Sequence, residues 1–288
     1  MQVELAVAPS GPISGAPRRT PSIDLGPLIE DAVKSAPNNA FIQSELDKLS
    51  GNARLVRFLH RFLLFNDALA ARVPFLAGLI HLTPDLFLDA DDAGRFCAQR
   101  NAGIAAHVAE AASDEYRMTP SRNMVHQHLS QVFFRAVLAH FGMEQARFDA
   151  ENPVPDAVNA LLAEARGLFF ENRSPENVFA ALGFHVGLEF FANEEFNDVD
   201  QFLNRRHEDL AAALKIEGPN GAPYVWLALH CVVEVGHYSA GLEAVRGAVE
   251  YCSPRRDAAR MAEQIMRGLD VFADLQLRFY QLVLAEGA

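Results

Sequence analysis

The sequence predicts an all-α protein, and three observations lead to this expectation. After residue 22, nearly every segment repeats apolar residues at spacings of three and four, which is the period of a helix that buries one face. The alternation of apolar and polar residues that is typical of strands is scarce. Proline, glycine and short polar residues mark short loops, so residues 23–288 are expected to form a single helical bundle.

The first half of the chain carries clear helix boundaries. Ser50-Gly51-Asn52 precedes a long apolar stretch that continues to about Leu82. The tripeptide Thr83-Pro84-Asp85 then breaks the pattern. Further along, Thr119-Pro120-Ser121 is expected to open a helix that runs to Gly142.

The second half continues in the same way. Ser174-Pro175-Glu176 is expected to open a helix that reaches about Phe196, and residues 218–221 form a loop before the next helix. The last helix is expected to have Pro254 in its first turn. It carries one apolar stripe that faces the core, made of Met261, Ile265, Leu269, Phe272, Leu275, Phe279 and Leu282.

Composition restricts the partners of the protein. The 288 residues are 50% hydrophobic, which suffices for a large core. The net charge of -12 argues against a nucleic-acid surface, because phosphate binding needs clustered Lys and Arg. We therefore expect a small-molecule substrate as the main partner, with an electron donor and a homodimer left open.

The cysteines and the N-terminus favour a cytoplasmic protein. Cys97, Cys231 and Cys252 are odd in number and lack C-x-x-C spacing, which suits a reducing compartment. Residues 1–22 have no basic and apolar regions of a signal peptide, and we interpret them as a mobile tail. No apolar run is expected to span a bilayer, which takes roughly 18 to 20 residues.

One segment concentrates potential metal ligands. Tyr224–Glu243 contains His230, Glu234 and His237 in the order H-x-x-x-E-x-x-H, and spacings of four and three place these side chains on one face of a helix. Burying three titratable groups among apolar neighbours is costly unless a partner such as a cation compensates. The sequence thus predicts a metal site, the alternative being two core histidines that Glu234 satisfies by hydrogen bonding.

A metal held in a bundle core usually takes ligands from several helices. Glu189 lies in the aromatic and aliphatic segment ALGFHVGLEFF, where a free carboxylate would be disfavoured, so it is the next predicted ligand. His185 lies one turn earlier on the same face and is predicted to orient a ligand from behind, rather than to bind metal or simply to fill the core. Glu194 and Glu195, in the polar segment NEEFND, are expected to be solvated.

A third helical region holds the remaining candidates. His126 shares a face with apolar residues and is expected to point inward, whereas His128 shares a face with polar residues. The carboxylate from this region is either Glu110 or Glu115, and periodicity does not decide between them.

With these residues in view, the chain resembles the haem-oxygenase-like di-iron oxidases and oxygenases, in the superfamily that also holds TenA-like and PqqC-like proteins. The resemblance covers roughly residues 40–285, and it implies a bundle of about seven core helices. The H-x-x-x-E-x-x-H segment is its most specific part. By this resemblance, Glu115 is preferred to Glu110, and the ligand set is Glu115, His126, Glu189, His230, Glu234 and His237.

The resemblance implies a chemistry as well. The cofactor would be two Fe(II) ions with O2 as co-substrate, and the reaction would be N-oxygenation, desaturation or carbon-carbon cleavage of a small amino-acid-derived or fatty-acid-like molecule in natural-product metabolism. The second ion is expected to be labile, because Glu115 lies beside the helix break at Thr119-Pro120. Arg117 and Arg122 are candidates to clamp a substrate carboxylate, against the alternative of exposed loop arginines.

Tyr116 and Tyr238 are expected to line the substrate pocket, the alternative being plain core aromatics. The chain departs from the family in carrying Glu234 where aspartate is more usual, and in the long gap between His126 and Glu189. Two rival functions remain open. One is a metal-independent TenA-like or PqqC-like enzyme, and the other is a non-enzymatic helical binding domain with a vestigial metal site.

Overall fold

The computed structural model describes residues 23–70, 72–83, 86–87, 94–117, 125–169, 173–218, 221–252 and 257–286, with the side chains of residues 94–98 and 114–117 left out. These residues form twelve helices and no β-strand, which confirms the predicted all-α bundle. The helices are α1 (Gly26–Ser35), α2 (Asn38–Lys48), α3 (Asn52–Ala70), α4 (Arg72–Leu82), α5 (Gly94–Arg117), α6 (His126–His140), α7 (Gln145–Glu151), α8 (Asp156–Gly167), α9 (Pro175–Arg206), α10 (Glu208–Leu214), α11 (Val225–Glu250) and α12 (Ala258–Ala285).

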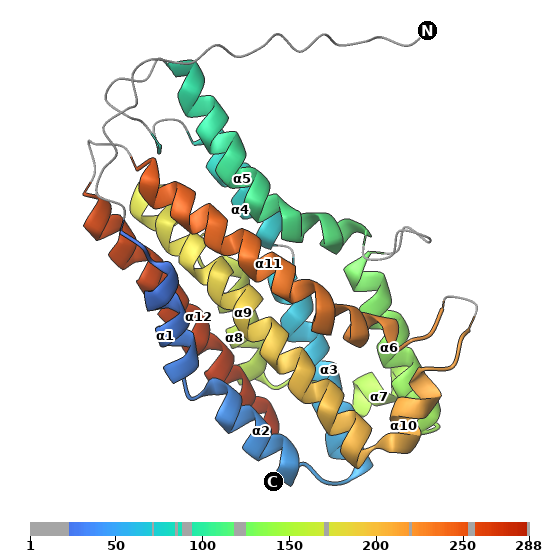
Figure 1. The fold of residues 1–288 in the computed structure, drawn as a ribbon. Helices are drawn as coiled ribbons and strands as arrows, with labels where there is room; N and C mark the ends of the chain where they lie inside the picture. Colours follow the sequence, from blue (N-terminus) through green and yellow to red (C-terminus); the bar gives the residue numbers. More distant parts are fainter. Residues whose placement is uncertain are drawn as a thin grey trace, which may run out of the picture.

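Helix α9 is the central element of the bundle. It packs along its length against α12 on one side and α11 on the other, and α11 in turn packs against α5 (Figure 1). Helix α4 lies against α5, while α1 and α2 cover the side formed by α9 and α12. Residues on α9 and α11 therefore face each other inside the bundle, which positions the site described below.

Two glycines allow α9 and α12 to approach closely. A Cβ atom added to Gly183 would collide with the backbone of Ile265, and one added to Gly268 would collide with the backbone of Ala180. The crossing is thus a direct contact between backbones. Any larger residue at either glycine would push the two helices apart.

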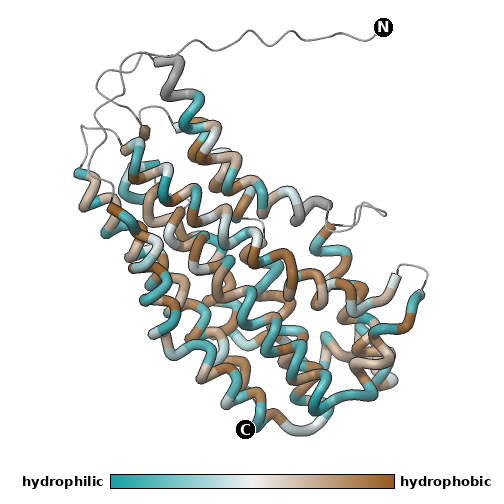
Figure 2. Tube along the Cα trace, viewed as in Figure 1, coloured by the Kyte–Doolittle hydropathy of each residue, from teal (hydrophilic) through white to brown (hydrophobic). Residues whose placement is uncertain are grey.

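The core is apolar and rich in phenylalanine. Along most helices, hydrophobic residues are interspersed with hydrophilic ones (Figure 2), as is typical of helices that bury one face.

Contrary to the sequence expectation, one helical stretch, Asn52–Leu82, is apolar and long enough to cross a membrane. However, 59% of its most apolar part is buried inside the bundle, and a core helix has the same composition, so this is weak support for a membrane span.

Some helix boundaries agree with the predicted ones and others differ. The apolar stretch predicted to run to about Leu82 is helical on both sides of residue 71, which lies outside the described residues, and it ends at Leu82 as predicted. Helix α9 has the predicted Ser174 cap, which accepts a hydrogen bond from the Asn177 N–H at 3.3 Å, but it continues past Phe196 to Arg206. It continues because apolar residues recur at helical spacing to Leu203 and are buried.

Two other helices begin after their predicted starts. Helix α6 begins at His126, after the extended N-cap Val125, and ends close to the predicted Gly142, whereas the predicted start at Thr119-Pro120-Ser121 lies outside the described residues. Helix α12 begins at Ala258, after the N-cap Asp257, whose carboxylate accepts the backbone N–H of Ala259 at 3.0 Å. The side-chain cap of Asp257 therefore marks the start of α12. Pro254, which was predicted to lie in the first turn, lies outside the described residues.

Candidate metal centre

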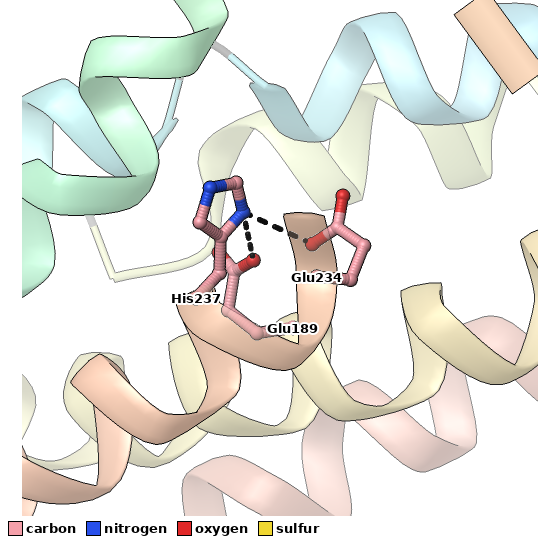
Figure 3. A group of neighbouring side chains, drawn as sticks. All are labelled: Glu189, Glu234 and His237. Carbon is pink, nitrogen blue, oxygen red and sulfur yellow. Dashed lines mark hydrogen bonds and ion pairs between the residues drawn. The ribbon is translucent and has the colours of Figure 1, made fainter. Parts of the chain in front are cut away.

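Helices α9 and α11 bring three predicted ligands together in the core. Glu189 comes from α9, and Glu234 and His237 come from successive turns of α11 (Figure 3). His237 Nδ1 lies 3.3 Å from a Glu189 oxygen and 3.2 Å from a Glu234 oxygen. One ligand atom from each residue lies within 4.8 Å of the other two, and all three residues are buried. The described residues therefore include a group that could hold a metal ion.

His185 lies behind Glu189, as predicted for an orienting residue. Its Nδ1 is 3.1 Å from Glu189 Oε1, whereas the other oxygen of Glu189 faces His237. His185 is 3% exposed, and its ring nitrogens make no geometrically regular hydrogen bond. The close ion-pair distance still places an imidazole against the back of the carboxylate.

His230 and His126 form a second cluster beside the first. His230 Nδ1 donates to the backbone carbonyl of Trp226 at 2.6 Å, which leaves the Nε2 atom with its lone pair directed away from that carbonyl. His230 Nε2 lies 3.2 Å from His126 Nδ1. The periodicity argument for His126 is confirmed, because His126 is buried and His128 is exposed.

The outer nitrogen of His126 has two neighbours that the sequence did not indicate. His126 Nε2 lies 3.4 Å from Trp226 Nε1 and also 3.4 Å from an Asp67 oxygen. In one tautomer it accepts from the indole N–H, and in the other its own N–H donates to Asp67. The second tautomer leaves the Nδ1 lone pair toward His230, which is the arrangement of a carboxylate-oriented histidine ligand.

Glu234 connects the two clusters. One of its oxygens is 3.2 Å from His237 Nδ1, and the other is 4.0 Å from His230 Nε2. A carboxylate placed in this way has one oxygen for each side of the site. The α11 motif therefore contributes to both clusters, and Glu234 lies between its two histidines.

Burial and mutual charge set the protonation of the first cluster. Burial alone would raise the pKa of Glu189, but His185 and His237 outweigh it and hold that pKa well below its usual range. Burial and the charge of Glu189 raise the pKa of Glu234 well above its usual range. Despite burial, the two carboxyl groups raise the pKa of His237 to about 11. Without metal, the cluster is an ion pair between Glu189 and His237 beside a protonated Glu234.

The second cluster is electrostatically different. Burial and the neighbouring His126 lower the pKa of His230 well below its ordinary value. His230 is therefore neutral at physiological pH, which is the form that binds metals. A small cavity of about 20 Å³ lies between these side chains and residues of α3, α4 and α9. It is lined by His126, Glu189, His230 and Glu234, and by Asn66, Leu69, Ala70, Val73, Leu188, Ala192 and Phe196.

Other predicted site residues cannot be placed or lie elsewhere. The side chains of Glu115, Tyr116 and Arg117, and the whole of Arg122, lie outside the described residues. Tyr238 is not among the residues that line the cavity, and its ring packs against Phe190 with centroids 5.3 Å apart.

Glu110, the alternative to Glu115, is exposed on α5 and lies outside the cluster. Glu194 is half-buried and accepts a hydrogen bond from Asn39 Nδ2 at 3.1 Å, so it is less solvated than predicted.

The expectation that Glu195 is solvated is wrong. Glu195 is 1% exposed and accepts hydrogen bonds from Gln276 Nε2 at 2.6 Å and from the Tyr280 hydroxyl at 3.1 Å. Burial raises the pKa of Glu195 to about 7. Hydrogen bonds from Gln276 and Tyr280, and from Asn66 at the edge of the cavity, only partly offset this effect. Its donors Gln276 and Tyr280 belong to α12 and are distant from Glu195 in the sequence, so the local pattern NEEFND does not indicate them.

Neither a comparison with protein-family models nor a search of curated proteins finds a match to this chain.

Proposed function

We propose that the protein is a non-haem di-iron oxidase or oxygenase that uses O2 to oxidise a small molecule. The observation that carries this proposal is the position of Glu234, which has one oxygen toward the Glu189–His237 cluster and the other toward the His126–His230 cluster. Two adjacent groups of nitrogen and oxygen donors that share one carboxylate are the donor set of a dinuclear centre. The resemblance of the chain to haem-oxygenase-like di-iron enzymes supports the same assignment.

The residues present suit iron. One ion would be held by Glu189, Glu234 and His237, and a second by Glu234, His126 and His230, with Glu115 completing the set. Mixed imidazole and carboxylate ligands favour Fe(II) or Mn(II), whereas structural zinc sites usually contain cysteine. When bound, the iron would supply the activation of O2, which no amino-acid side chain performs.

The protein side chains prepare this site. The Trp226 carbonyl holds the N–H of His230 and so keeps its Nε2 available as a donor. Asp67 is placed to hold the outer N–H of His126 in the same way, and His185 supports Glu189. Metal binding would replace the protons of His237 and Glu234, so the positive charge of the ion is offset by the two carboxylates already in place.

The proposal also includes a class of substrate, an electron donor and a location. The substrate would be a small amino-acid-derived or fatty-acid-like molecule of specialised metabolism, and an electron donor would restore the reduced iron. A cytoplasmic location agrees with Cys231 and Cys252, which are free thiols.

A second candidate function rests on the same geometry. The ion pair of Glu189 with His237 and the protonated Glu234 satisfy one another without a metal, as in a metal-independent TenA-like enzyme or a binding domain with a vestigial site. This alternative predicts no specific iron binding, or iron binding without O2 consumption.

Anaerobic Fe(II) titration followed by O2 exposure separates the two functions. We expect up to two Fe(II) per chain, and then O2 consumption with a transient visible absorption. A His230→Ala, His237→Ala double variant is the control and should lose both signals. If the parent retains no more iron than this variant, the ligand assignment is wrong. If it retains iron but consumes no O2, the protein is not an oxygenase.

A further inference from the structure

A polar network is buried in the core beside the cavity at the candidate metal centre. At its middle lies Glu195 of α9, which is buried and does not belong to the proposed ligand set. Gln276 Nε2 and the Tyr280 hydroxyl both donate to Glu195 Oε2, at 2.6 and 3.1 Å, so Oε1 is the oxygen that can carry a proton. Asn38 of α2 donates to Gln276 Oε1 at 2.9 Å and fixes the amide. Helices α2 and α12 therefore hold this carboxyl group in one orientation.

On its inner side the network reaches the metal centre. Asn66 of α3 forms a hydrogen bond with Glu195 and also lines the cavity that the ligand side chains line. Phe196, the residue after Glu195, lines the same cavity and stacks on the His230 ring with centroids 4.1 Å apart. The cavity of about 20 Å³ has room for one water molecule, and its carboxylate and imidazole groups offer that water hydrogen-bond partners. One amide and one water are thus enough to join Glu195 to Glu234 and His230.

On its outer side the network reaches the protein surface. Asp198 lies one turn after Glu195 on α9 and is also buried. Its Oδ1 accepts a hydrogen bond from Nε2 of the exposed Gln43 at 2.7 Å. Its Oδ2 is buried and has no hydrogen-bond partner in the described part of the chain. A buried carboxylate oxygen without a partner is unfavourable, and a proton or a water shared with Glu195 would satisfy it. Asp198 is therefore placed between Glu195 and solvent.

The charges around Glu195 allow its protonation to change near neutral pH. Burial raises its pKa to about 7, and the negative charge of Asp198 adds to this shift. Burial and the charge of Glu194 raise the pKa of Asp198 to about 6. Helix α12 presents Tyr280, whose pKa is well above its usual range, and α2 and α3 present neutral amides. A group that exchanges its proton near neutral pH is suited to proton transfer.

The proposed oxidation consumes protons at a buried site. When one atom of O2 enters the substrate and the other becomes water, the reaction takes up two electrons from the electron donor and two protons from solvent. We propose that Glu195 relays protons from the surface to the candidate metal centre during this reaction. Its carboxyl group gives up a proton toward the cavity at Asn66, and the resulting carboxylate takes a proton back from solvent through Asp198. The relay rests on the proposed function.

Infrared spectroscopy of the metal-free protein tests whether Glu195 carries a proton. We expect the carbonyl stretching band of a protonated, buried carboxyl group, and this band should disappear as the pH rises through about 7. Glu195→Gln should lack the titrating band, and Glu194→Gln, the matched control from the same helix, should keep it. A parent without a titrating band, or a band that survives in Glu195→Gln, would overturn the relay.

The rate of O2 consumption by the anaerobically Fe(II)-loaded protein tests the transfer itself. In the parent this rate should fall as the pH rises through about 7, because only protonated Glu195 can donate. Glu195→Gln keeps the shape of the side chain and should retain the iron content of the parent. Its rate should nevertheless be lower by about tenfold or more and independent of pH in this range. Glu195→Asp restores an acid and should recover the pH dependence, and Glu194→Gln should match the parent.

Two results with the iron-loaded protein would overturn the relay. One is a Glu195→Gln variant with the rate and pH profile of the parent. The other is a slower Glu195→Gln variant that keeps the pH profile of the parent, since a purely structural role would give this result. Failure of the proposed function is distinguishable: the parent itself then binds no iron or consumes no O2 although the infrared band of Glu195 is present, and the relay falls with it.

Discussion

Glu189 and Glu234 are both buried beside His237, but they carry different charges in the metal-free protein. The histidines keep Glu189 ionised, and the negative charge of Glu189 together with burial keeps Glu234 protonated. A glutamine side chain is neutral, so in the metal-free state it has the same charge as the protonated Glu234 and a different charge from the ionised Glu189. In the metal-bound state it would imitate neither, because both would be anionic ligands.

This difference in charge predicts that the two substitutions affect the free energy of unfolding of the metal-free protein differently. Glu234→Gln should change the free energy of unfolding of the metal-free protein by less than about 1 kcal/mol and reduce the iron content below two per chain. Glu189→Gln should lower that free energy by up to about 3 kcal/mol, because it removes the anion paired with His237, and only Glu234, whose ionisation is disfavoured by burial, can replace it. Urea unfolding and iron analysis measure both effects. Equal destabilisation by the two variants, or full iron content in Glu234→Gln, would refute this account of the protonation.

Glu195 makes stability depend on pH in a defined window. In the unfolded chain its pKa returns to the ordinary 4.5, and in the folded protein it is about 7, so the native state binds more protons between these values. Stability from this group is fully present below the unfolded pKa and is lost as the pH rises through the folded pKa. The loss amounts to about 3 kcal/mol.

Glu195→Gln should remove this loss. Relative to the parent, the metal-free variant should gain about 3 kcal/mol between about pH 4 and pH 8. Glu194→Gln on the same helix is the matched control and should follow the parent. Urea unfolding at a series of pH values measures the difference. A parallel pH dependence of the Glu195→Gln variant and the parent would contradict the assigned pKa.

At the scale of helices, the contact between α9 and α12 depends on the two facing glycines. Gly183→Ala places a methyl group on the Ile265 carbonyl, and it should lower the free energy of unfolding by about 3 kcal/mol or more, since rigid backbone must move. Gly236→Ala on α11, where an added Cβ meets nothing within 4 Å, is the control and should be neutral or stabilising. Denaturant midpoints of the two variants give the comparison, and similar midpoints would show that the backbone contact is not tight.

The helices also predict unequal metal sites. Glu189, Glu234 and His237 belong to α9 and α11, which pack along their lengths, whereas the other site needs His126 at the first turn of α6. Helix ends open at lower free energy than packed centres. An anaerobic Fe(II) titration should therefore resolve one tight and one weaker ion, and Glu115→Ala should lose the weaker ion only. Two equally tight ions in the parent, or both ions retained by Glu115→Ala, would argue against this asymmetry.

At the scale of the whole molecule, features that depend on local sequence patterns were predicted from the sequence, whereas features that depend on contacts between distant segments were not. The all-α class and the shared face of His230, Glu234 and His237 follow from helical periodicity, and so does the inward position of His126. The burial of Glu195 depends on Gln276 and Tyr280 of another helix, which a single segment cannot indicate.

The start of α6 and the contact of Asp67 with His126 were not predicted either. Helix α6 begins at His126, after the extended N-cap Val125, whereas the proline signal at Thr119-Pro120-Ser121 that was expected to open it lies outside the described residues. Asp67 was missed because it lies on α3, and only the packing of α3 against α6 brings it beside His126.

The most direct test of the central claim is the crystal structure of the Fe(II)-loaded protein with anomalous diffraction data at the iron absorption edge. The account predicts two peaks about 3.5 to 4 Å apart, on either side of the Glu234 carboxylate. One peak should lie beside Glu189 and His237, and the other beside His126 and His230. Iron located only at the surface, or a core in which Glu189, Glu234 and His237 remain paired with one another and no peak is present, would contradict it.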